Sequence, residues 1–210
     1  FYFIFMTDIL EHQLLKSLKS HFGYDSFRGQ QQSIIENVLN KKDTLVIMPT
    51  GGGKSICFQL PATIFNGLTL VISPLIALMK DQVDGLNANG IKAAFYNSSQ
   101  QSSEQQHIIE QVLNKELKLL YVAPESLSGL ENILKESQIS CVAIDEAHCI
   151  SSWGHDFRPA YREIKILREL HPSVTFLALT ATAKKDVEKD IIQLLDLYQP
   201  KVIKQSFKRE

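Results

Sequence analysis

The stretch Met48-Pro49-Thr50-Gly51-Gly52-Gly53-Lys54-Ser55 decides the fold of this chain, because it continues the apolar run Thr44–Met48. Consecutive glycines let a backbone curl around an anion with its N–H groups pointing inward, since no Cβ blocks the approach. A helix that begins at Lys54 would aim its positive dipole end at the same anion. A strand, a glycine loop and a helix in this order predict a phosphate-binding loop.

The side chains of this loop suit nucleotide chemistry. Lys54 carries a full positive charge for terminal phosphates, and Ser55 offers a hydroxyl to Mg²⁺. The strict pattern has glycine at the position of Met48, and the triple glycine compensates for that departure. The alternative is a glycine-rich turn that happens to precede a lysine. The predicted nucleotide ligands here are Thr50, Gly51, Gly52, Gly53, Lys54 and Ser55.

Length and composition are those of an ordinary globular chain. The 210 residues can form one large α/β domain or two small ones. A hydrophobic share of 44% and a charged share of 21% are typical values. A net charge of -1 gives no general attraction to nucleic acid, so charge neither supports nor excludes that partner.

The cysteine spacing argues against a zinc site, and the apolar start is too short for a signal peptide or a membrane span. Cys57, Cys141 and Cys149 are scattered, and we expect reduced, buried thiols of a cytosolic protein. Without a Cys-x-x-Cys pair or a His-Glu-x-x-His motif, the sequence predicts no zinc site. Phe1–Phe5 is too short for a signal peptide core or a membrane span. We therefore treat residues 1–7 as an extension, with Met6 as a candidate initiator.

Apolar spacing predicts alternating helices and strands. The expected strands are Thr44–Met48, Leu68–Ile72, Lys92–Tyr96, Leu117–Val122, Ser140–Ile144, Val174–Leu179 and Lys201–Gln205. The expected helices are Asp8–His21, Gln30–Asn40, Lys54–Phe65, Leu75–Asn87, Ser103–Asn114, Glu125–Glu136, Tyr161–Leu170 and Lys184–Leu195. The strands lack polar alternation, which favours burial on both faces and a mainly parallel sheet between two helical layers. We predict a single α/β domain.

Capping residues, glycines and prolines refine the predicted ends of these helices. Asp8 suits a helix N-cap, and the pair Ser102/Ser103 before Gln105 and Gln106 is typical of a capping box. Gly90 suits the end of a helix. Two prolines, Pro124 and Pro159, suit first helical turns, whereas Pro61 should kink or weaken its helix.

A second candidate element, which is acidic, follows the apolar strand that ends at Ile144. Asp145 and Glu146 would lie at the carboxyl edge of the sheet, where α/β proteins bind ligands. Asp145 can hold the Mg²⁺ that bridges nucleotide phosphates, and Glu146 can orient and deprotonate the attacking water. Alone, such a pair could be a solvated turn, but a phosphate loop upstream favours catalysis.

These elements together resemble a known family. Asp145–His148 with Gly51–Ser55 resembles the ATPase core of superfamily 2 helicases, and further motifs resemble the RecQ family of DNA helicases. The resemblance implies a RecA-like fold over nearly the whole chain from Phe22, with one departure at Gly29-Gln30, where the family usually has Pro-Gly. The segments that carry it are Phe22–Gln31, Thr50–Cys57, Ser73–Val83, Ala123–Glu125, Asp145–Pro159 and Leu179–Ala183.

The resemblance assigns adenine recognition to the first of these segments. Gln31 would read the adenine edge, while Tyr24 and Arg28 would sandwich the base. The chemistry agrees, because an amide can pair with adenine N6 and N7, and aromatic and guanidinium planes stack well. The alternatives are an ordinary surface glutamine at Gln31 and a core aromatic at Tyr24.

The resemblance also implies that the loop Ser152–Pro159, called the aromatic loop below, senses single-stranded DNA and couples that contact to ATP hydrolysis. This loop follows Asp145–His148, the acidic box. Trp153 and Phe157 offer stacking faces, and His155 and Arg158 offer positive or switchable polarity. The alternative is a buried Trp–Phe pair that anchors the loop.

Four further residues receive coupling roles from the resemblance. Lys80 would contact DNA phosphates, although a lone lysine is usually only solvated. Thr180 and Thr182 would link the phosphate site to the DNA face, or cap the helix from Lys184. His148 would relay between the hydrolytic site and Thr180.

The family also sets expectations for what surrounds this chain. Residues 8–206 would be the first RecA-like, ATP-binding domain, and 207–210 would begin the linker to a second RecA-like lobe that carries an arginine finger. Alone, the chain should bind ATP or ADP with Mg²⁺ and hydrolyse poorly. The longer protein would be a 3′-to-5′ DNA helicase of the bacterial cytoplasm or nucleoid, acting in DNA repair and recombination on single-stranded and partly duplex DNA, with no membrane partner.

Three other functions remain open at this point. An RNA-remodelling ATPase shares the phosphate loop and acidic box. A non-catalytic nucleotide-binding module would keep the fold, but Lys54, Ser55, Asp145 and Glu146 argue against a degenerate site. A small-molecule kinase would not explain Trp153–Arg158.

Overall fold

A seven-stranded sheet forms the centre of the computed structural model, which describes residues 2–205, with side chains from residue 11 onward. Every strand pairing is parallel, in the order β3-β4-β2-β5-β6-β1-β7. The predicted parallel α/β fold is confirmed. The strands are β1 Thr44–Ile47, β2 Leu68–Ile72, β3 Ala93–Tyr96, β4 Leu119–Val122, β5 Ile139–Ile144, β6 Thr175–Thr180 and β7 Lys201–Lys204.

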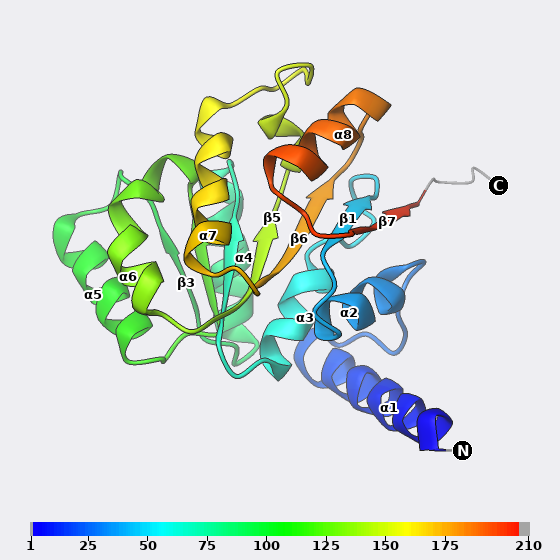
Figure 1. The fold of residues 1–210 in the computed structure, drawn as a ribbon. Helices are drawn as coiled ribbons and strands as arrows, with labels where there is room; N and C mark the ends of the chain where they lie inside the picture. The colour runs from blue at the N-terminus through cyan, green and yellow to red at the C-terminus, as the bar shows by residue number, and fades with distance from the viewer. Residues whose placement is uncertain (1, 206–210) are drawn as a thin grey trace.

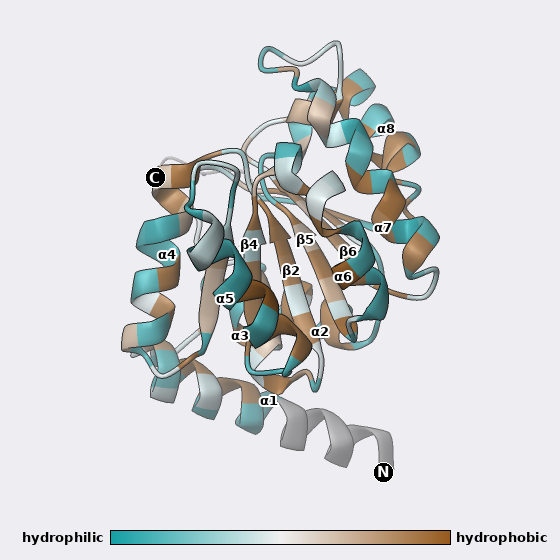
Figure 2. Cartoon of the chain, turned by 90° about the vertical axis from the view of Figure 1, so that its left-hand side faces the viewer, coloured by the Kyte–Doolittle hydropathy of each residue, from teal (hydrophilic) through white to brown (hydrophobic). Residues whose placement is uncertain are grey.

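Helices cover both faces of the sheet (Figure 1). One face packs on α2 (Gln31–Leu39), α3 (Ile56–Ile64) and α4 (Ile76–Ala88). The other packs on α5 (Ser102–Leu113), α6 (Glu131–Glu136), α7 (Lys165–Leu170) and α8 (Lys185–Leu194). Alternate residues of β5 enter the two cores, since Val142 and Ile144 face one side and Cys141 and Ala143 the other. In Figure 2 the strands are accordingly mostly hydrophobic, while outer helix faces carry many hydrophilic residues.

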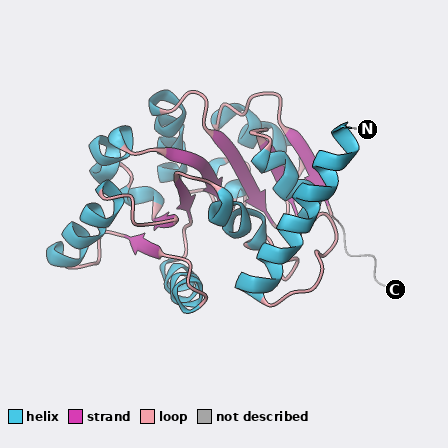
Figure 3. Ribbon diagram, turned by 90° about the horizontal axis from the view of Figure 1, so that it is seen from below, coloured by secondary structure: helices cyan, strands magenta, loops and turns pink. Residues whose placement is uncertain are grey.

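An N-terminal helix, α1 (Tyr2–Phe22), lies outside this three-layer body (Figure 3). Leu14 and Leu18 pack on residues of α2 and α3 in a small third core. The prediction that Asp8 caps this helix is wrong, because Asp8 lies inside it. The expected linker at 207–210 lies outside the described residues.

Two expected helices are wound partly as 3₁₀ turns. The segment after β4 comprises η1 (Pro124–Ser126), η2 (Ser128–Leu130) and then α6, and the segment after the aromatic loop comprises η4 (Pro159–Ile164) and then α7. In η4 the buried residues Tyr161 and Ile164 are three positions apart, which matches the three residues per turn of a 3₁₀ helix.

Helix ends agree with sequence reasoning at some positions and differ at others. Gly90 adopts a φ of +75° after α4, where the predicted glycine stop is confirmed. The capping box of α5 uses Glu104, whose carboxylate accepts from the Gln101 N–H, and not the predicted serine–glutamine pairs. The phosphate-loop helix α3 begins at Ile56, two residues after its predicted start, and continues through Pro61 to Ile64.

Candidate active site

Strand order brings three segments to one edge of the sheet. β5, β6 and β1 are neighbours, so their carboxyl ends lie side by side. These ends lead into the acidic box, the Thr180 segment and the phosphate loop, respectively. In Figure 1 the chain leaves β5 at this edge and continues as the loop at the top of the molecule. Parallel α/β proteins bind ligands at such an edge.

The phosphate loop depends on its glycines. Gly51 and Gly53 have φ values of +81° and +78°, which side chains other than glycine rarely adopt. At Gly52 an added Cβ would lie 2.6 Å from the Met48 side chain. Lys54 and Ser55 precede α3, and the Lys54 ammonium donates to the Met48 carbonyl at 3.0 Å. A backbone oxygen therefore holds the lysine side chain across the loop.

Gln31 reaches this loop from the start of α2. Its amide nitrogen donates to the Gly53 carbonyl at 3.1 Å, and its amide oxygen accepts from the Arg28 N–H at 2.8 Å. Only 4% of Gln31 is exposed, so the surface-glutamine alternative is wrong. Tyr24 is 45% exposed and is not a core aromatic. The Arg28 guanidinium lies 5.3 Å from its ring centroid, so the two expected stacking partners lie on each other.

The two carboxylates follow β5 directly. Burial, followed by repulsion from Glu146, raises the pKa of Asp145 to about 6, while the Lys54 charge opposes the shift. Glu146 has a φ of +49°, an uncommon conformation for a residue with a side chain. The buried Tyr161 hydroxyl donates to the Asp145 carbonyl at 2.9 Å and fixes the turn.

His148 joins the acidic box to the end of β6. Its Nδ1 lies 3.3 Å from the Glu146 carboxylate and 2.9 Å from the Thr180 hydroxyl. The Thr180 hydroxyl donates in turn to the Thr182 carbonyl at 3.1 Å. Burial lowers the pKa of His148. The residues of the predicted relay therefore contact one another, and its role stays a prediction. The alternative that these threonines cap α8 is wrong, because that helix has no side-chain cap.

The aromatic loop presents its tryptophan to solvent. Trp153 is 77% exposed, so the alternative of a buried Trp–Phe pair is wrong. The His155 ring stacks on His148 with centroids 5.0 Å apart. Phe157 lies under the Arg162 guanidinium, and Arg158 donates to the Pro74 carbonyl at 3.3 Å. Through His155 and Arg158 the loop contacts both the acidic box and the segment that leads to α4.

Some supporting residues were not predicted. Ser151 is buried and its hydroxyl donates to Asp190 of α8 at 2.6 Å, which anchors the loop below Trp153. No local pattern announces a partner that is 39 positions away. Of the other predicted residues, Lys80 is exposed on α4, and the three cysteines are buried and free, as expected.

Comparison with known proteins assigns the chain to a family. The sequence pattern described as "DEAD/DEAH box helicase" matches residues 28–190. The chain belongs to the DEAD/DEAH box helicase family. Over 95% of its length, the chain is 50% identical to the ATP-dependent DNA helicase RecQ of Pasteurella multocida and 48% identical to that of Bacillus subtilis. The predicted RecQ resemblance is confirmed.

These relatives are longer proteins. The chain spans 32% and 34% of their lengths, respectively. A solved structure titled as a hypothetical ATP-dependent RNA helicase from Sulfolobus tokodaii superposes with a TM-score of 0.70 at 20% identity, over 92% of this chain and 57% of that one. This likeness supports the helicase-family RecA-like fold. Between residues 2 and 205, none of the helices has the length and apolar character needed to cross a membrane.

Proposed function

We propose that this chain is the first, ATP-binding motor lobe of a 3′-to-5′ DNA helicase that translocates on single-stranded DNA and unwinds partly duplex DNA. One observation carries the proposal. Glu146 contacts His148, His148 contacts Thr180, and His148 stacks on His155 of the aromatic loop. A carboxylate suited to hydrolysis is thus joined, through one buried imidazole, to a loop suited to stacking on nucleic acid bases.

ATP and Mg²⁺ fit the residues present. Lys54 and the inward-curving glycines suit the phosphates, and Ser55 and Asp145 offer the oxygen ligands that Mg²⁺ prefers. The raised pKa of Asp145 reflects a buried negative charge beside Glu146 that a cation would relieve. When bound, Mg²⁺ supplies charge neutralisation on the phosphate oxygens.

The chain's own residues then act in sequence. ATP binding draws the Lys54 ammonium from the Met48 carbonyl to the phosphates, and inserts adenine between Tyr24 and Arg28, which must separate. Gln31 holds the base edge. Glu146 orients a water and accepts its proton, and His148 carries the change to Thr180 and His155.

The partners complete the site. Trp153, His155, Phe157 and Arg158 contact single-stranded DNA, and Lys80 contacts its phosphates. A second RecA-like lobe supplies an arginine across the cleft, which in phosphoryl transfer contributes about 10³–10⁵ in rate. The isolated chain therefore hydrolyses ATP weakly. We place its action in DNA repair and recombination, in the bacterial cytoplasm or nucleoid.

Binding of a fluorescent ATP analogue tests the nucleotide assignment. The wild-type chain should bind it in the presence of Mg²⁺, more weakly in EDTA, and Lys54→Ala should lose binding while keeping its circular dichroism spectrum. Equal binding by the variant would contradict the site.

The nearest alternative function is that of an RNA-remodelling ATPase, and the second is that of a non-catalytic nucleotide-binding module. Stimulation of the longer protein by single-stranded DNA and RNA of matched sequence separates these functions. We expect DNA to stimulate turnover more. Preference for RNA, or no turnover with either, would favour the first or second rival.

A further inference from the structure

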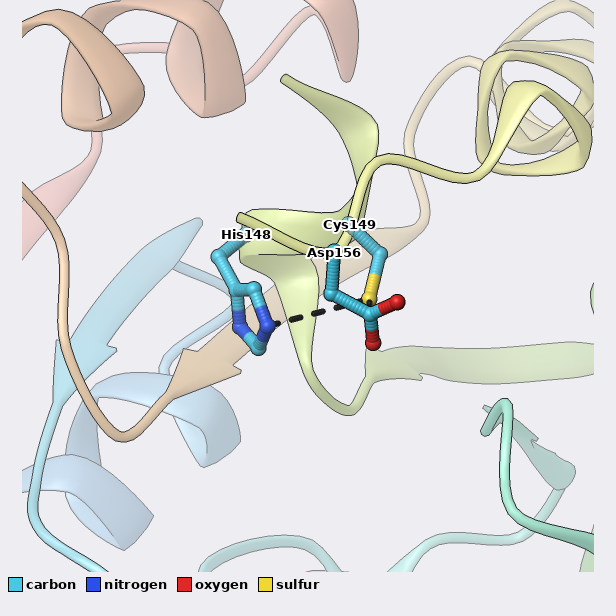
Figure 4. A group of neighbouring side chains, drawn as sticks. All are labelled: His148, Cys149 and Asp156. Atoms are coloured by element: carbon cyan, nitrogen blue, oxygen red, sulfur yellow. Dashed lines mark hydrogen bonds between the residues drawn. The ribbon is translucent and has the colours of Figure 1, made fainter. Parts of the chain in front are cut away.

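His148, Cys149 and Asp156 form a cluster of metal-ligating side chains beside the hydrolytic site. Figure 4 shows the imidazole and the carboxylate converging on the sulfur from two sides. The Cys149 sulfur lies 3.8 Å from His148 Nε2 and 3.7 Å from an Asp156 carboxylate oxygen. In a tetrahedral zinc site the corresponding ligand atoms lie about 3.5 Å apart. All three ligand atoms lie within 4.8 Å of one another, so they are already gathered, at distances somewhat longer than a bound cation imposes.

The hydrogen bonds fix which nitrogen of His148 faces the sulfur. The Thr180 hydroxyl donates its proton to the Thr182 carbonyl, so it must accept from His148 Nδ1. Glu146, also beside Nδ1, can only accept when ionised. Nδ1 therefore carries the ring proton, and Nε2 presents its lone pair to Cys149. A histidine that ligates a metal is typically oriented in this way, with its other nitrogen donating to a carboxylate.

The single Cys149 thiol proton lies between two acceptors, while the other carboxylate oxygen of Asp156 lies 3.7 Å from the Arg158 guanidinium. A thiol donates a single hydrogen bond, yet the Nε2 lone pair and the Asp156 carboxylate both face the Cys149 sulfur. A divalent cation in place of that proton would satisfy all three groups. Access is also present, because Asp156 is exposed while His148 and Cys149 are buried behind it.

We propose that His148 Nε2, Cys149 Sγ and Asp156 bind one thiophilic divalent cation of the zinc class, with solvent in the fourth position. Binding forms a metal–sulfur bond and releases the thiol proton to solvent, with no change in oxidation state. The cysteine spacing did not predict this site, because the cluster uses only one cysteine and its ligands follow no known metal motif.

A cation here would tie the aromatic loop to the acidic box. It would hold Asp156 against His148 and keep the ring proton on Nδ1, beside Glu146. If the proposed function is correct, this fixes the relay in one state and slows ATP turnover reversibly. Binding of the cation itself does not depend on that function.

Cobalt spectroscopy on this chain, made without a histidine tag, tests the site. Co²⁺ should bind at one equivalent per chain, with a thiolate charge-transfer band and the visible bands of tetrahedral cobalt, and Zn²⁺ should displace it. Cys149→Ser should abolish the charge-transfer band, and Asp156→Asn should weaken Zn²⁺ binding by at least about 10-fold. Cys141→Ala and Asp84→Asn, at a buried thiol and an exposed carboxylate elsewhere, are the matched controls and should bind as the wild type does.

The assay contains no nucleotide or DNA, so its result does not depend on the proposed helicase function. The proposal is overturned if the wild type does not bind Zn²⁺, or if either cluster variant binds it as tightly as the wild type. Should Cys149→Ser fail to fold by circular dichroism, Asp156→Asn decides alone, since its side chain is exposed.

Discussion

Gln31 packs directly against Gly53 of the phosphate loop. Its amide nitrogen donates to the Gly53 carbonyl at 3.1 Å, and a Cβ at Gly53 would lie 2.3 Å from that nitrogen. The residue expected to read adenine is therefore also a support of the loop expected to hold the phosphates. We therefore expect adenine binding at Gln31 to affect the phosphate loop through this side chain.

Gln31→Ala should weaken ATP binding by about 10-fold and reduce the preference for ATP over GTP, because it removes both the loop contact and the base contact. Competition against a fluorescent ATP analogue measures both effects. Gln32→Ala is the matched control, since the Gln32 side chain bonds Glu36 on the same helix instead. An equal loss in the control variant would refute the assignment.

Glu146→Gln should bind ATP and keep it unhydrolysed, because the amide cannot accept a proton from the attacking water. In the proposed longer protein with a second lobe, we expect steady-state hydrolysis to fall at least about 100-fold, within the range for loss of a general base. Filter binding with radiolabelled ATP would detect the trapped nucleotide. Normal unwinding by this variant would remove Glu146 from the mechanism.

Asp145→Asn should stabilise the chain in the absence of nucleotide and Mg²⁺. Burial and Glu146 raise the pKa of Asp145 from 3.8 to about 6, so the ionised carboxylate destabilises the folded state. The gain in the free energy of unfolding should be about 1–3 kcal/mol above pH 6, shrink as the pH falls toward 4, and vanish below it.

Urea unfolding at pH 7 and pH 4 measures that difference. Asp84→Asn, at an exposed position of α4, should change stability little at either pH. A destabilised Asp145→Asn variant at pH 7 would mean that the carboxylate makes favourable contacts that outweigh its burial.

Trp153→Ala should weaken single-stranded DNA binding by about 10-fold or more without destabilising the fold, since one base–aromatic stack contributes about 1–3 kcal/mol. Trp153 and Tyr198 are 77% and 75% exposed, so Tyr198→Ala is a control of nearly equal exposure away from the loop. Fluorescence anisotropy of a labelled oligonucleotide, with the longer protein, compares the two variants. Equal effects would show that the loop is not the contact.

Sequence reasoning was most successful where local chemistry dictates structure. The glycines of the phosphate loop, the apolar strands and the Gly90 stop each follow from backbone geometry, and all lie where expected. Glu125–Glu136 and Tyr161–Leu170 were predicted as continuous helices, but each begins as 3₁₀ turns and becomes α-helical only at Glu131 and Lys165, respectively. Apolar spacing does not separate the two windings, because buried residues three positions apart fit both.

The site shows the same division. Lys54, Asp145 and Glu146 carry recognisable patterns, whereas the bonds from Ser151 to Asp190 and from Arg158 to Pro74 join distant segments. The direct Tyr24–Arg28 contact was also not predicted, since the two residues were expected to stack on opposite faces of a base rather than on each other.

The most direct test compares ATP hydrolysis, with and without single-stranded DNA, by this chain and by the proposed longer protein that contains a second lobe. We predict weak, DNA-independent hydrolysis by the chain alone and strong DNA stimulation of the longer protein, which Lys54→Ala abolishes. Robust DNA-stimulated turnover by residues 1–210 alone would contradict the claim that this chain provides only half of the active site.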